Sequence, residues 1–121
     1  MAETDLMQRT KEFALRIIRL YVALPKSTEA QVLGKQVLRS GTSIGAHYRE
    51  ANRAKSDADF IHKLETGLQE LDEILYWLEL IVEAGIFSET RVTPLCEETK
   101  ELNAIFTTIV KKVKDRKNKD K

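Results

Sequence analysis

The chain has 121 residues, with 20 Lys or Arg and 19 Asp or Glu, so its net charge is only +1. This length suits a single domain with its own core, and near neutrality excludes the strongly basic class of dedicated nucleic-acid binders. Cys96 is the single cysteine, which excludes an intrachain disulfide and fits a reducing cytosol. The acidic N-terminus argues against a signal peptide, and no stretch approaches the roughly 18 uncharged residues of a membrane span. We therefore expect a cytoplasmic protein.

The first predicted helix runs from about Asp5 to Ala23, with Thr4 or Asp5 as its N-cap. Pro25 ends it, because a proline pushes the residue before it out of the helical region. Its apolar side chains repeat at intervals of three and four, which is typical of an amphipathic helix. The repeat consists of Leu6, Thr10, Phe13, Ile17, Leu20, Tyr21 and Leu24.

The second predicted helix begins after Ser27 or Thr28 and ends near Ala54. Its middle, residues 38–51, contains an unusual number of small side chains. Gly41 and Gly45 would each cost about 1 kcal/mol relative to Ala in a helix interior. We expect these glycines to permit the close approach of a neighbouring helix or of another subunit. An apolar stripe on this helix comprises Leu33, Val37, Ser40, Ile44, Tyr48 and Ala51.

A basic stripe lies opposite this apolar stripe. At about 100° per residue, the other members fall within roughly 40° of Lys35. They are Lys35, Arg39, Arg49 and Arg53. One interpretation is an ordinary solvated face. The other is a surface for nucleic-acid phosphates, because Arg suits bidentate phosphate contacts and backbone contact needs only spaced positive charge.

The third predicted helix spans about Asp57 to Ala84. Ser56 followed by Asp59 resembles a capping box, and Gly85 can take the left-handed conformation that stops a helix. Its apolar face comprises Phe60, Leu64, Gly67, Leu71, Ile74, Leu75, Leu78, Ile81 and Val82.

Three large apolar residues of the third helix lie off that face: Tyr76 and Leu80 point nearly to the far side and Trp77 points to the flank. Together at one helix end they predict a subunit interface, although incidental exposure is the alternative. The glycine seam at Gly41 and Gly45 is a second candidate for a subunit contact.

The fourth predicted helix follows Ile86-Phe87-Ser88. For Pro94 two readings stay open: Thr93 caps the helix with Pro94 in its first position, or an earlier turn bends at the proline. Residues 114–121 are mostly charged, and we expect a frayed tail, either solvated or serving as an arm for nucleic acid. The helix carries Val92, Leu95, Cys96, Thr99, Leu102, Phe106, Ile109, Val110 and Val113 at helical spacing.

No alternating β-branched run lies between turn residues, so no strand is expected. Four helices with short connections predict an all-α fold, an antiparallel up-down-up-down four-helix bundle in one domain over residues 1–121. The charge along the chain is uneven: residues 26–63 carry +3, residues 64–101 carry −8, and residues 102–121 carry +5. This separation favours self-association as much as nucleic-acid binding.

The sequence gives little support for catalysis or metal binding. A bundle with two metal ions uses Glu-x-x-His, whereas His47 and His62 precede Glu50 and Glu65 in the reverse order. We interpret both pairs as surface placement and expect no metal and no cofactor. Ser40 and Ser43 have no histidine on their expected face, and residues 41–45 lack the Gly-Lys-Ser/Thr ending of a phosphate-binding loop. Cys96 lies by the apolar stripe, which indicates an inert thiol.

The run Leu38–Ala46, continuing through Tyr48–Ala51 and Arg53–Ser56, resembles the four helix bundle protein family, also called the 23S rRNA-intervening sequence protein family. Residues 59–61 and 71–80 resemble the third helix of that family. The resemblance covers most of the chain and is strongest from Leu38 to Leu80. It implies a bacterial, cytosolic, non-enzymatic bundle, found within intervening sequences of large-subunit ribosomal RNA genes.

Similar bundles are accessory subunits of reverse transcriptases in diversity-generating retroelements, where they form ring-like homopentamers with a positively charged surface. The resemblance therefore implies a homo-oligomer, most simply a pentamer. We expect its acidic third helix to pair with a basic surface of the next subunit. We expect it to bind RNA or DNA, or a nucleic-acid-handling protein, through the basic stripe. The alternative is a structural or protein–protein adaptor with no nucleic-acid contact.

Overall fold

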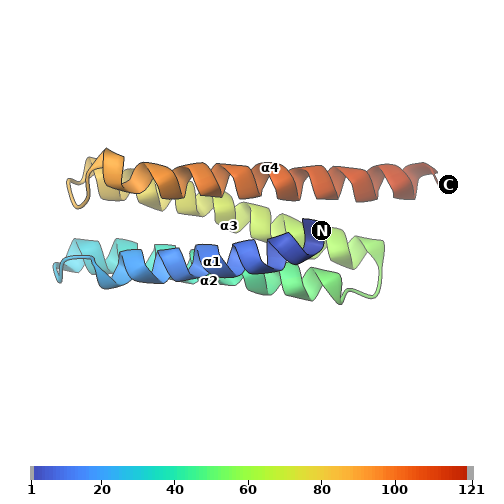
Figure 1. Cartoon of the computed structure of the whole chain (residues 1–121), viewed down its shortest axis with the longest axis horizontal. Helices are drawn as coiled ribbons and strands as arrows, with labels where there is room; N and C mark the ends of the chain where they lie inside the picture. Colours follow the sequence, from blue (N-terminus) through green and yellow to red (C-terminus); the bar gives the residue numbers. More distant parts are fainter. Residues whose placement is uncertain (1, 120–121) are drawn as a thin grey trace.

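The computed structural model describes residues 2–119, with side chains from Leu6 onward. Four helices follow one another: α1 (Ala2–Val22), α2 (Thr28–Asn52), α3 (Asp57–Glu83) and α4 (Glu89–Lys119). Each helix runs antiparallel to the one before it, so the described chain forms an up-down-up-down bundle (Figure 1). The predicted all-α four-helix bundle is confirmed.

The core runs along the bundle and contains the stripes predicted from helical spacing. Tyr48 of α2 and Phe106 of α4 pack at its centre, with ring centroids 5.9 Å apart. Full burial of such side chains contributes about 1.5–3 kcal/mol each, so these stripes dominate the stability of the bundle. The largest fully buried side chains are Tyr48, Phe13, Phe106, Ile17, Ile44, Leu64, Leu71, Ile74, Leu78, Ile81, Leu102 and Val37.

Two helix ends follow the predicted capping chemistry, and a third, at Ser88, has a cap that was not predicted. The Ser56 hydroxyl accepts a hydrogen bond from the Asp59 backbone N–H at 3.1 Å, which starts α3. Gly85 adopts φ +76°, which allows a sharp stop after α3. Ser88 accepts from the Arg91 backbone N–H at 3.3 Å and so starts α4. The predicted cap of α1 at Thr4 or Asp5 lies outside the described side chains, and α1 itself begins at Ala2.

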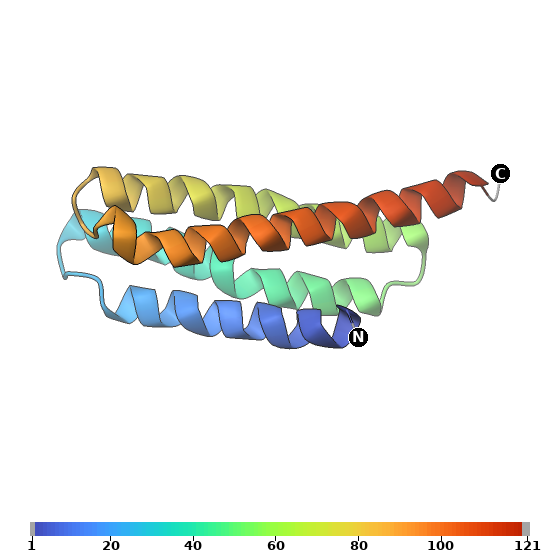
Figure 2. The same cartoon turned by 45° about the horizontal axis from the view of Figure 1, so that its top comes forward.

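Helix α4 begins directly after residues 86–88, as predicted, and at its other end it extends into the segment predicted as a tail. It begins at Glu89, so Pro94 lies inside the helix and Thr93 is not its cap. The Thr93 hydroxyl instead donates to the Glu89 carbonyl at 2.8 Å. At the other end α4 remains helical to Lys119 and projects beyond the rest of the bundle (Figure 2). Residues 114–119 thus continue the helix, the fraying of this charged end stays a prediction, and residues 120–121 lie outside the described part.

Arg9 fastens α1 to α4. Its Nε lies 2.7 Å from Glu98 Oε2 and its Nη2 lies 2.8 Å from Glu98 Oε1, a bidentate pair, and Nη2 also donates to Glu101. The hydrogen bonds to Glu98, and secondarily those to Glu101, raise the pKa of Arg9, so the guanidinium stays charged. This pair closes the side of the bundle where the first and last helices meet.

Candidate nucleic-acid and assembly surfaces

The small residues of α2 allow α1 to lie close against it. A Cβ added to Gly41 would lie 2.6 Å from Ile17 Cγ1, and one added to Gly45 would lie 3.1 Å from Thr10 Oγ1. Both neighbours belong to α1 of the same chain. The assignment of Gly41 and Gly45 to a subunit interface is therefore wrong, whereas the alternative of a close helix–helix approach is confirmed.

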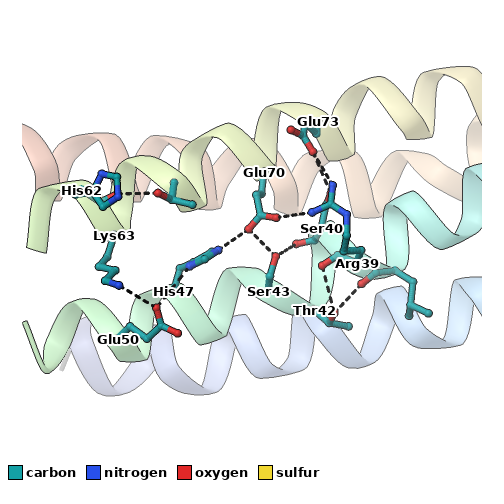
Figure 3. A network of polar contacts seen from close by, with 12 residues as sticks. Arg39, Ser40, Thr42, Ser43, His47, Glu50, His62, Lys63, Glu70 and Glu73 are labelled. Carbon is teal, nitrogen blue, oxygen red and sulfur yellow. Dashed lines mark hydrogen bonds and ion pairs between the residues drawn. The ribbon is translucent and has the colours of Figure 1, made fainter. Parts of the chain in front are cut away.

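The other side of the same stretch carries a polar network centred on Glu70 of α3 (Figure 3). Glu70 is 8% exposed, and its carboxylate accepts a hydrogen bond from Ser43 Oγ at 2.6 Å. His47 Nε2 lies 2.7 Å and Arg39 Nη1 lies 3.1 Å from its oxygens. These contacts hold α2 against α3, because a nearly buried carboxylate needs each of its partners.

Glu73 extends this network towards solvent. It accepts hydrogen bonds from Arg39 Nη2 at 3.1 Å and from Ser40 Oγ at 3.3 Å. Glu50 stands at the other end, with Lys63 Nζ 3.5 Å and His47 Nδ1 3.9 Å from its Oε1. The longer distance to His47 is beyond hydrogen-bonding range.

Two sequence-based interpretations need correction here. His47 is not a surface residue by chance, because its Nε2 contacts buried Glu70. It also shares that carboxylate with Ser43, so a histidine does lie on the serine face. The arrangement differs from a nucleophile triad, in which histidine lies between serine and carboxylate. Here Glu70 lies between Ser43 and His47, and the Ser43 hydroxyl lies 2.6 Å from the carboxylate and 3.0 Å from the Ser40 carbonyl oxygen.

The basic stripe divides into two parts in the structure. Arg39 is ion-paired with Glu70 and Glu73, so its charge is neutralised within the chain. Lys35, Arg49 and Arg53 are exposed, and within residues 6–119 none of them has an ion pair within 4.0 Å. The surface available for an anionic partner is therefore Lys35 and Arg49 of α2 with Arg53 at its C-cap, without Arg39.

Some of the acidic charge of α3 is also paired within the chain. Lys114 Nζ lies 3.0 Å from Glu65 Oε2, and Arg116 Nη2 lies 3.0 Å from Asp57 Oδ1. These pairs tie the last turns of α4 to the start of α3, which accounts for helix where the sequence predicted a tail. The charge separation along the sequence is thus partly resolved inside one subunit.

The predicted interface residues of α3 differ in exposure. Tyr76 is 53% exposed, whereas Trp77 and Leu80 are half-buried and Trp77 packs against the core. The Tyr76 ring lies 5.1 Å from the Trp77 ring, centroid to centroid. The Trp77 Nε1–H is buried without a hydrogen-bond partner in the described structure. Tyr76 is therefore the member of this group that a partner could contact most fully.

A groove of about 610 Å³ runs between the end of α3 and the start of α4. We call it the α3–α4 groove. Its rim carries four carboxylates, Glu79, Glu83, Glu89 and Glu97, against one cation, Lys100. Its apolar lining includes Leu75, Tyr76, Val82, Val92 and Cys96. Burial raises the pKa of the Cys96 thiol, so little of the nucleophilic thiolate forms at neutral pH.

A second apolar surface, on α1, was missed by the sequence analysis. Met7, Leu15, Ile18 and Val22 are 39%, 40%, 39% and 70% exposed. We call these four residues the outer face of α1. They fall within about 80° of one another at 100° per residue. The signal was present in the sequence, because α1 carries apolar side chains on two sides and only the side facing the core was identified.

A group of cations also went unnoticed. Arg16 and Arg19 of α1 line a shallow groove with Arg91 of α4. Arg91 lies over the Phe87 ring, 4.1 Å from its centroid, which is cation–π geometry. This end of the α1–α4 boundary is therefore basic. At its other end, Arg9 neutralises carboxylates of α4, Glu98 and Glu101.

Within the described residues, metal-binding clusters and membrane-spanning helices are both absent. No group of three or more His, Cys, Asp or Glu side chains there is arranged to hold a metal ion. No described helix combines the length and apolar character needed to cross a membrane.

The chain matches a protein family and a solved structure. A model of the 23S rRNA-intervening sequence protein family matches residues 2–108. The chain belongs to this family. The chain is also similar to a solved structure, a protein of unknown function from the S23 ribosomal protein family of Bacteroides thetaiotaomicron, determined at 1.70 Å resolution. It is 40% identical, with a TM-score of 0.86, and the match covers 92% of this chain and 99% of the other. A comparison with curated proteins found no match.

Proposed function

We propose that this chain is a non-enzymatic, homo-oligomeric bundle of the cytoplasm, with five subunits as in similar bundles, that binds RNA through α2. The observation that carries the proposal is the exposed cationic surface of Lys35, Arg49 and Arg53, which lack ion pairs within residues 6–119. Unpaired cations along one helix are what phosphate contact requires. The family name refers to intervening sequences of 23S rRNA, so RNA is the appropriate first probe.

A titration with a short fluorescein-labelled single-stranded RNA tests this proposal. The variant Lys35→Gln/Arg49→Gln/Arg53→Gln is compared with the unaltered protein by fluorescence anisotropy across a series of KCl concentrations. Three lost phosphate contacts should make the negative slope of log K against log [KCl] shallower by about 2 units, at roughly 0.7 per contact for a single strand. Arg39 stays unaltered, because removing it would leave Glu70 without one of its partners.

The matched control is Lys111→Gln/Lys112→Gln/Lys117→Gln, which removes the same charge from exposed positions on α4. It should keep the slope of the unaltered protein. Equal losses in both triple variants, or binding that ignores KCl, would contradict α2 as the contact surface. No RNA binding by the unaltered protein would contradict the proposed function itself.

The α3–α4 groove favours a second candidate, a protein–protein adaptor with no nucleic-acid contact. Its four carboxylates around an apolar floor suit a basic, amphipathic protein segment. Under this alternative the α2 cations are simply solvated. A protein that assembles but shows no salt-dependent RNA binding would favour the adaptor.

A further inference from the structure

Two surfaces of the bundle lack partners within the chain and differ in character. The outer face of α1 (Met7, Leu15, Ile18 and Val22) is apolar and convex, and it carries exposed cations, Lys11 within it and Arg19 beside it. The α3–α4 groove is hollow, with an apolar lining and an excess of carboxylates on its rim. Neither Lys11 nor Arg19 has an ion pair within 4.0 Å among the described residues. The two surfaces therefore complement each other in shape, polarity and charge.

The two surfaces also lie at the same end of the bundle. Residues 15–22 form the second half of α1, which ends beside the turn between α3 and α4 (Figures 1 and 2). The groove is formed by the last turns of α3 and the first turns of α4 at that end. The outer face of α1 turns away from the core and so away from the chain's own groove. One subunit therefore cannot fill its own groove with this face, whereas a neighbour placed beside it at the same height can.

We propose that the outer face of α1 in one copy of this chain docks into the α3–α4 groove of the next copy. Such a contact joins different surfaces on the two partners, so it is heterologous and generates a ring when the rotation closes. Burial of Leu15, Ile18 and Val22 supplies the apolar part of the contact. Lys11 and Arg19 meet the groove carboxylates, which selects the register and disfavours like-charged pairings. This inference rests on the proposed homo-oligomer and names the surfaces that form it.

The heterologous contact is tested by two variants, each of which removes one surface. Leu15→Asp/Ile18→Asp places carboxylates on the outer face of α1 and leaves the groove intact. Tyr76→Arg/Glu83→Arg places cations on the groove and leaves α1 intact. All four positions are exposed or near the surface, so both variants should keep the helical content and the urea midpoint of a folded bundle. Each variant alone should raise the dissociation constant of assembly by at least about 100-fold and run as a monomer.

Mixing the two variants in equal amounts gives the decisive readout. Each has one intact surface, so a heterologous contact predicts a 1:1 heterodimer of twice the 13.9 kDa chain mass in light scattering. A mixture that stays monomeric would overturn the proposal. So would an oligomer that survives the α1 substitutions, or one that depends on α1 and survives the groove substitutions. The control Thr107→Asp/Thr108→Asp adds the same charge to exposed positions far along α4 and should keep the native mass.

Cys96 provides a second readout, because it lines the groove. A docked neighbour should slow its reaction with a thiol-labelling reagent, and Leu15→Asp/Ile18→Asp should restore the rate. Labelling belongs at alkaline pH, since burial raises the pKa of this thiol. Equal labelling rates in both proteins would contradict docking at the groove. A monomeric unaltered protein would refute the proposed homo-oligomer itself, whereas an oligomer that ignores both surfaces refutes the present inference alone.

Discussion

At the residue scale, Glu70 explains why α2 carries polar side chains where a helix of a bundle would ordinarily carry apolar ones. Arg39, Ser43 and His47 all contact its carboxylate, which is almost buried between α2 and α3. A buried carboxylate costs desolvation energy that these contacts offset. The network is therefore tied to one register of α2 against α3.

We expect Glu70→Ala to lower the free energy of unfolding by about 1–3 kcal/mol, because it leaves His47 Nε2 without its partner and removes the shorter of the two hydrogen bonds of the Ser43 hydroxyl. Urea unfolding followed by circular dichroism measures the change. Glu73→Ala is the control: Glu73 contacts Arg39 as well but is 46% exposed at its side chain, so its loss should cost less than about 1 kcal/mol. Equal effects of the two substitutions would show that burial of Glu70 does not matter.

At the scale of helices, the central feature is that α2 packs α1 on one side and α3 on the other. Gly41 serves the first contact and Ser43 the second, from positions two residues apart. A Cβ at residue 41 would overlap Ile17 at 2.6 Å. The close approach of α1 thus depends on the absence of a side chain at this position.

Gly41→Leu should therefore destabilise the bundle by about 1–3 kcal/mol through overpacking, even though leucine favours helix more than glycine does. Ala46→Leu provides the comparison on the same helix, because Ala46 is exposed and its change should stay within about 0.5 kcal/mol. Thermal and urea unfolding of both variants measure this difference. If Gly41→Leu is as stable as Ala46→Leu, the glycine is incidental to packing.

The helices and most of the core were predictable from sequence, because the spacing of Phe13, Ile17, Ile44 and Leu64 depends only on helical geometry. The Glu70 network was not, because spacing along one helix does not reveal which polar residue faces a neighbour. The role of Arg39 changed for the same reason: a wheel places it on a basic stripe, while its charge is neutralised by α3. The α1 outer face was predictable and was missed, because only one apolar side of α1 was sought.

At the scale of the whole molecule, this member of the 23S rRNA-intervening sequence protein family has exposed surfaces of different chemical character. One side of α2 presents unpaired cations, α1 presents an apolar face, and the end of α3 with the start of α4 presents an acidic groove. A subunit with two complementary surfaces is suited to assembly, which would repeat the α2 cations around the oligomer. Repetition strengthens weak phosphate contacts through effective concentration.

The most direct test of this account is the absolute mass of the purified protein by light scattering, before and after nuclease treatment, with ultraviolet absorbance recorded for nucleic acid. The account predicts a discrete oligomer, a whole-number multiple of 13.9 kDa, that carries nuclease-sensitive material and keeps its subunit number after treatment. A monomer of 13.9 kDa at every concentration would contradict assembly and leave the outer face of α1 and the α3–α4 groove without the partner assigned to them.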